Sequence, residues 1–113
     1  MISVTIYKTS SDQFRGFILS GHAGYDQYGQ DIVCASVSAL VINTVNSIEK
    51  FTNDTFDLEH DAKTGFMKLK FHNKEISQEG NLLMNSLVLG LKGIQSSEQS
   101  GNKKFLSIHF KEV

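Results

Sequence analysis

Hydrophobic residues alternate with polar ones in five separate stretches of the chain. In ISVTIY, near the start, every second residue is a β-branched hydrophobic residue, and a period of two is typical of a strand with one buried face. The polar segments TSSDQ and DAKTG each separate two such stretches, which predicts two hairpins. The predicted strands cover residues 2–7, 14–21, 55–60, 65–72 and 104–113.

Two longer stretches repeat their hydrophobic residues at helical spacing. The first follows Asp31 and runs to Phe51. It is far longer than a typical strand of about 5–6 residues, so we predict a buried helix with Asp31 as its N-cap, despite many β-branched residues. The second, over 76–97, is predicted to be an amphipathic helix in which Gly90 and Gly93 allow close approach to another element.

The order of these elements, ββαββαβ, predicts an α+β fold formed by one domain, residues 1–113. We expect a mixed, mostly antiparallel five-stranded sheet with both helices on one face. The open face should carry threonine, lysine, glutamate and histidine side chains. A small sheet of this kind leaves unpaired edges, which favours a homodimer.

Composition narrows the possible functions. The formal net charge is −1, without the basic excess of proteins that bind nucleic-acid phosphates, so no direct nucleic-acid partner is expected. A single cysteine excludes an internal disulfide and paired-cysteine zinc motifs. His60, His72 and His109 are interpreted as ordinary strand residues without ligand spacing, so no metal or other cofactor is expected.

Nothing in the sequence predicts a targeting or membrane segment. The first ten residues lack the cationic start and apolar core of a secretory signal. The longest uncharged run, 32–48, is short and polar for a membrane span. We therefore expect a cytoplasmic protein that does not contact a membrane.

The cysteine, Cys34, is predicted to lie in the first turn of the first helix. Backbone N–H groups there have no partner within the helix, and the helix end carries partial positive charge, so the position favours a thiolate. His22, at the end of the second strand, is a candidate to accept the thiol proton. The hypothesis is a thiolate–imidazolium pair beside helix N–H groups that hold an oxyanion. The alternative is that Cys34 is only a small core residue.

The residues between His22 and Cys34 leave further alternatives open. Asp31 could cap the helix or orient the imidazole of His22. The connection AGYDQYGQ could be a lid with hinges at its glycines, or an ordinary loop with two exposed tyrosines.

One part of the sequence, GHAGYDQYGQDIVCASVSAL, resembles the signature of the bacterial ribosomal-processing cysteine proteases, the Prp family. The matching features are a Gly-His-Ala motif, a variable loop, and Asp-Ile-Val-Cys-Ala at a helix start. The resemblance extends to the length and the order of elements. It implies catalytic roles for Cys34 and His22, with Asp31 as helix cap or histidine orienter. The implied substrate-binding residues are Gly21, Ala23, Tyr25, Tyr28, Gly29 and Ser38.

The family resemblance also implies a substrate. Family members remove a short N-terminal extension from the large-subunit ribosomal protein L-twenty-seven, cutting after a phenylalanine, and they form dimers with a loop that gates the site. The expected partner is thus a ribosomal protein precursor, with no cofactor. Two alternatives are a ribosome-associated binding module in which Cys34 is only packed, and a cysteine-dependent acyl transferase or thioesterase.

Overall fold

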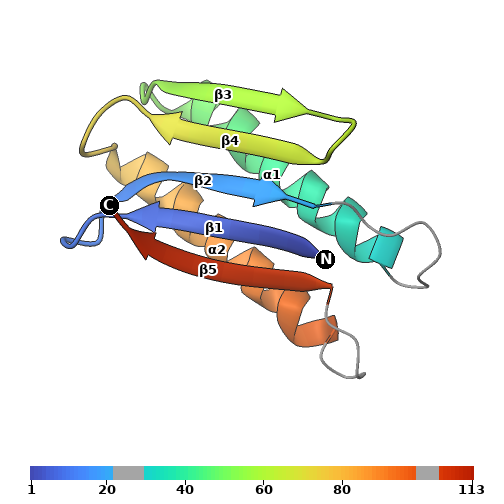
Figure 1. Ribbon diagram of the computed structural model, residues 1–113. Helices are drawn as coiled ribbons and strands as arrows, with labels where there is room; N and C mark the ends of the chain where they lie inside the picture. The colour runs from blue at the N-terminus through green and yellow to red at the C-terminus, as the bar shows by residue number, and fades with distance from the viewer. Residues whose placement is uncertain (22–29, 99–104) are drawn as a thin grey trace.

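The computed structural model describes residues 1–21, 30–98 and 105–113, without the side chains of residues 30, 31 and 98. In this part of the chain two helices pack against one face of a five-stranded sheet and leave its other face open (Figure 1). The predicted α+β fold and the order ββαββαβ are confirmed. The elements are β1 (Ile2–Lys8), β2 (Phe14–Ser20), α1 (Gln30–Phe51), β3 (Phe56–Asp61), β4 (Phe66–Phe71), α2 (Gln78–Glu98) and β5 (Leu106–Glu112).

The sheet has the strand order β3-β4-β2-β1-β5. Strands β1 and β2 pair antiparallel, as do β2 with β4 and β3 with β4. The pair of β1 with β5 is parallel, which makes the sheet mixed and mostly antiparallel, as predicted. Both predicted hairpins are present, and β3 and β5 form the two edges.

The core lies between the sheet and the helices. A row of fully buried side chains crosses the sheet, because Ile6 pairs with Phe17 and Phe17 pairs with Leu69. The helices cover this row with buried residues such as Val41 of α1 and Leu87 of α2. Each large aliphatic or aromatic side chain removed from water stabilises the fold by about 1.5–3 kcal/mol.

Helix α1 meets the core with one row of residues at helical spacing. These are Val33, Val37, Val41, Val45 and Ile48. By length and composition, Ile32–Phe51 would suffice to cross a membrane, but a core helix passes the same test. The burial of this row against the sheet accounts for the apolar sequence of α1.

The two helices are close at Gly90. A Cβ atom at this position would lie 2.6 Å from Leu40 Cδ2, so the glycine admits the α1 side chain against the α2 backbone. This confirms the predicted close approach at Gly90. The same prediction is wrong for Gly93, because a Cβ there would meet nothing within 4 Å.

Phe110 belongs to the apolar face of β5 by its alternation, yet 49% of its surface is exposed. It pairs with Ile6 and therefore points to the helix side, but β5 is an edge strand and the helices do not cover it fully. Instead, the Nζ atoms of Lys8 and Lys92 lie 5.8 and 5.4 Å from its ring centroid. The two ammonium groups make cation–π contacts that partly shield the ring.

The start of α2 is fastened to the loop that follows α1. The Ser77 backbone N–H donates to Asp54 Oδ1 at 2.9 Å, and its hydroxyl donates to Asp54 Oδ2 at 2.6 Å. Ser77 Oγ in turn accepts the Gly80 N–H at 2.9 Å, as an N-cap side chain does. This network fixes the direction of α2 relative to α1.

Ser77→Ala should lower the free energy of unfolding by about 1–2 kcal/mol, because it removes the cap and one hydrogen bond to Asp54. Urea denaturation followed by circular dichroism measures the change. Ser86→Ala, at an exposed position of the same helix, is the control and should change stability by less than about 0.5 kcal/mol. Equal effects of the two substitutions would contradict the capping role.

Candidate active site

Cys34 lies near the start of α1, two positions further into the helix than the sequence predicted. The helix begins at Gln30, so the backbone of Asp31 is already helical. The prediction of Asp31 as N-cap residue is therefore corrected. The first four N–H groups of a helix lack partners within it, and Cys34 follows directly behind them.

The row of residues on α1 that contains Cys34 flanks the buried valine row. This second row consists of residues spaced four apart: Cys34, Ser38 and Ile42. Each of them directly follows one of the buried valines in the sequence. Cys34 is only half-buried and packs against the edge of the core. Cys34 is thus held by the helix but remains partly exposed, which a purely structural core cysteine does not require.

This flanking row forms one wall of a cleft of about 220 Å³. The opposite wall comes from β3, β4 and the turn between them, and the ends of β1 and β2 close the floor. Most lining side chains are apolar. The lining residues are Ile2, Leu19, Gly21, Cys34, Val37, Ser38, Ile42, His60, Ala62, Gly65, Phe66 and Met67.

Three predicted site residues, Gly21, Cys34 and Ser38, share this cleft. Gly21 follows β2 with φ +100°, a backbone conformation that favours glycine, and a Cβ atom there would lie 2.2 Å from the Met1 carbonyl oxygen. Any other residue would clash with the backbone of the first residue. Glycine is thus required just before position 22, at the edge of the cleft.

The other predicted site residues lie outside the described residues. They are His22, Ala23, Tyr25, Tyr28 and Gly29, together with the side chain of Asp31. Their predicted roles as base, substrate contacts and histidine orienter stay predictions.

Sequence reasoning missed His60. It was interpreted as an ordinary strand residue, but it lines the same cleft as Cys34. The signal was present in the alternation of β3, since a period of two places His60 on the same face as Phe56 and Leu58, and it pairs with the buried Met67. The sequence could not indicate that this face of β3 borders the same cleft as Cys34.

The other two described histidines have different surroundings. The ring nitrogens of His72 lie 2.9 Å from Thr55 Oγ1 and 2.9 Å from Asp57 Oδ1. His109 contacts the Ser107 hydroxyl through Nε2. Neither residue lines the cleft. Within residues 1–21, 30–98 and 105–113, no three histidine, cysteine or acidic side chains are grouped as metal ligands would be.

Comparison with known proteins gives concordant matches. The family model described as cysteine protease Prp matches residues 1–102. Ribosomal processing cysteine protease Prp of Staphylococcus aureus (strain Mu50 / ATCC 700699) is 31% identical over 98 residues, which are 84% of this chain and 89% of the relative. The protein of the same name from Bacillus subtilis (strain 168) is 29% identical over 98 residues, covering 84% and 88%.

Solved structures match over almost the whole chain. An essential ribosomal processing protease Prp from S. aureus, in complex with a covalently linked product peptide, has a TM-score of 0.84 at 26% identity, covering 98% of this chain and 100% of that one. A crystal structure of a Streptococcus mutans protein gives 0.77 at 30% identity, covering 98% and 99%. Together with the cleft at Cys34, these matches define the class of protein as a cysteine protease. The chain belongs to the cysteine protease Prp family.

His60→Ala should raise the KM for a peptide substrate about 2- to 10-fold and leave kcat nearly unchanged. The reason is that a contact at the rim of the cleft is made in the bound substrate and in the transition state alike, and one hydrogen bond contributes about 0.5–1.5 kcal/mol. Steady-state cleavage kinetics measure both constants. His109→Ala, on the open sheet face, is the matched control and should change neither. Complete loss of kcat in folded His60→Ala protein would contradict a role at the rim.

Proposed function

We propose that this chain is an endopeptidase that removes the N-terminal extension of a ribosomal protein precursor, the large-subunit protein L-twenty-seven. The observation that supports the proposal most directly is the partly exposed Cys34 at the wall of an apolar cleft. Its relatives in S. aureus and B. subtilis are named ribosomal processing cysteine proteases. The related S. aureus enzyme has been crystallised with a substrate peptide and with a covalently linked product peptide.

In the proposed mechanism, Cys34 Sγ attacks the scissile carbonyl carbon and His22 accepts the thiol proton. The negative charge that develops on the carbonyl oxygen is held by N–H groups of the first turn of α1. Collapse of the tetrahedral intermediate breaks the C–N bond, and His22 passes its proton to the leaving amine. Water then attacks the thioester, gives its proton to His22, and releases the new carboxylate with regenerated Cys34.

The cleft is suited to an apolar residue of an extended peptide. Its walls are formed mainly by aliphatic side chains and Phe66, and the few polar groups there, at Ser38 and His60, would fix the peptide's orientation. A hydrophobic side chain before the cut, such as phenylalanine, would fill it beside the thiol. Ser38 lies one helical turn after Cys34 on the same face of α1, within reach of a neighbouring peptide group.

The proposed enzyme works in the cytoplasm as a homodimer and needs no cofactor. Support for an association surface comes from the outer side of α2, where Leu82 and Leu89 are 70% and 73% exposed. They are two turns apart and form an apolar strip that a second copy could cover.

Incubation with the precursor protein and mass spectrometry of the products tests the proposal. A single cut after phenylalanine, with loss of the extension, is expected. Cys34→Ser and His22→Ala should each reduce the cleavage rate at least about 10³-fold, because they remove the nucleophile and its base. Thermal unfolding of each variant shows whether the fold is kept. Ser36→Ala, on the exposed side of α1, is the control and should cleave normally. An intact precursor after incubation with folded wild-type protein would contradict the proposal.

Native-state alkylation separates a protease from a binding module in which the cysteine is only packed. An accessible, ionised thiol should react with iodoacetamide below pH 7, in one equivalent and with loss of cleavage. Slow labelling up to pH 9 would favour a packing role. Turnover of an acyl thioester without cleavage of peptides would favour an acyl transferase or thioesterase instead.

A further inference from the structure

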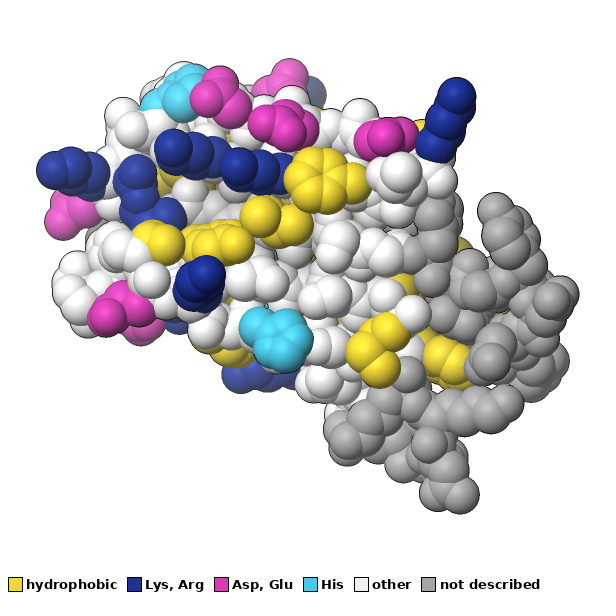
Figure 2. All heavy atoms as spheres, in the orientation of Figure 1, with side chains coloured by type: hydrophobic (Ala, Val, Ile, Leu, Met, Phe, Trp, Pro, Cys, Tyr) yellow, Lys and Arg dark blue, Asp and Glu magenta, His cyan; other side chains and the backbone are white. Residues whose placement is uncertain are grey.

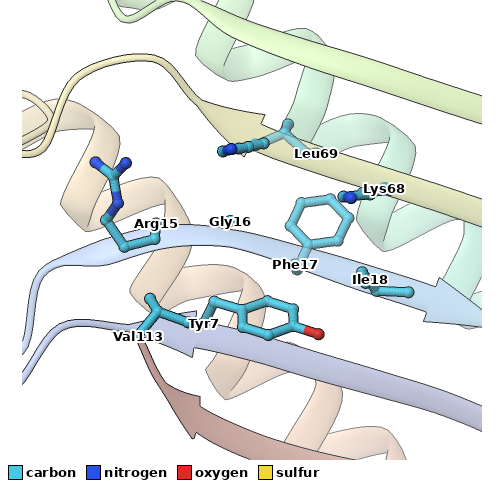
Figure 3. A pocket seen from close by; sticks show the side chains of 9 residues that line it. Tyr7, Arg15, Gly16, Phe17, Ile18, Lys68, Leu69 and Val113 are labelled. Atoms are coloured by element: carbon cyan, nitrogen blue, oxygen red, sulfur yellow. The ribbon is translucent and has the colours of Figure 1, made fainter.

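The open face of the sheet, opposite the helices, contains a second hollow of about 370 Å³. It lies over Gly16 of β2 and is bordered by side chains from both neighbouring strands (Figure 3). Tyr7 comes from β1, and Lys68 and Lys70 come from β4. The cleft that contains Cys34 has none of these residues in its lining. The hollow is therefore separate from the protease site.

The backbone of β2 creates this hollow. Tyr7 pairs with Gly16 and Lys8 pairs with Phe14, so Arg15 is an extra residue in the strand and forms a β-bulge. Gly16 has φ +155°, and a Cβ atom there would lie 2.1 Å from the Leu69 carbonyl oxygen. A side chain at this position would clash with the backbone of β4, so only glycine fits, and it contributes only backbone to the lining of the hollow.

Three cations border the hollow: Arg15, Lys68 and Lys70. The Arg15 guanidinium is held in place by a hydrogen bond to the Asn73 carbonyl oxygen. Lys68 and Lys70 form no ion pair or side-chain hydrogen bond with the described residues. Two residues apart on one strand, they project from the same face.

Figure 2 shows these charges from outside. Lysine and arginine side chains gather over one part of the open face, next to acidic side chains along the β3 edge. Asp57 and Glu59 are the cross-strand neighbours of Lys70 and Lys68. Asp57 is already engaged, because its Oδ1 lies 2.9 Å from His72 Nε2. The acidic edge lowers the positive potential of the face but leaves the two ammonium groups available.

We propose that this hollow binds single-stranded RNA. The phosphodiester groups would contact Lys68, Lys70 and Arg15, and one base would stack on the Tyr7 ring. Cations beside an aromatic ring on an exposed surface are the combination that single-stranded nucleic acids require. An acidic peptide would use the cations but would have no group for the ring.

This inference differs from the expectation drawn from net charge. The net charge of −1 is the sum over the whole chain, whereas the fold places these three cations around one hollow. It does not depend on the proposed protease substrate, because it concerns another face of the molecule.

Fluorescence anisotropy with a labelled oligoribonucleotide of about 12 nucleotides tests the inference. At low salt the full chain should bind it with a Kd of about 10⁻⁵ M. Three phosphate contacts predict a slope of about −2 for log K against log salt concentration. No change in anisotropy at a protein concentration of about 10⁻³ M would overturn the inference, since that lies far above the non-specific range.

Charge reversal locates the site. Lys68→Glu combined with Lys70→Glu should weaken RNA binding at least about 10-fold, and Tyr7→Leu at least about 5-fold. Lys50→Glu combined with Lys92→Glu makes the same change in net charge on the helices and should retain near wild-type affinity. If the reversed pair unfolds, Lys68→Ala with Lys70→Ala replaces it. If both double variants lose RNA affinity equally, the assignment of RNA binding to this hollow is overturned.

A polyglutamate peptide of matched charge serves as the competitor. It should displace the RNA only at concentrations at least about 10-fold higher than unlabelled RNA does. Equal competition would overturn the inference in favour of an acidic protein partner. Peptide cleavage by the Lys68→Glu, Lys70→Glu variant should equal that of the wild type, which separates this site from the protease function.

Discussion

The burial of one row of α1 against the sheet determines where the chemistry of this protein can take place. Val33, Val37 and Val41 must face the core, so the helix cannot rotate without exposing them to water. Cys34 follows Val33 by a single position and is therefore held at the border between core and solvent. A cysteine one position earlier would be enclosed, and a reactive thiol needs both a rigid support and access to substrate.

The fold was predictable from the sequence because its signals are local. Alternation and helical spacing gave all seven elements in order, and the polar turns marked both hairpins. The cleft was harder to predict from such local patterns, because its walls come from segments that are distant in the chain. His60 illustrates this: its face of β3 could be derived by counting, but its approach to Cys34 depends on how the β3–β4 hairpin lies over α1. The start of α1 at Gln30 and the open space at Gly93 likewise depend on tertiary context.

The two faces of the sheet have different surroundings. The inner face is filled by the core row of Ile6, Phe17 and Leu69, and the cleft beside Cys34 opens at its end. On the outer face, the bulge at Arg15 and the bare backbone of Gly16 interrupt an otherwise regular surface between cationic side chains. A count of charges over the whole chain cannot distinguish these faces, since only the register of the strands assigns each residue to one of them.

The parallel pairing of the first and last strands affects how this protein matures during translation. Strand β1 lies between β2 and β5, and the Ile2 N–H donates to the Phe105 carbonyl at 2.8 Å. One side of β1 therefore has no partner until residues 106–112 have left the ribosome that synthesises them. Ile2 also forms part of the floor beneath Cys34. The strand that supplies part of this floor is therefore fully paired only after residues 106–112 have been synthesised.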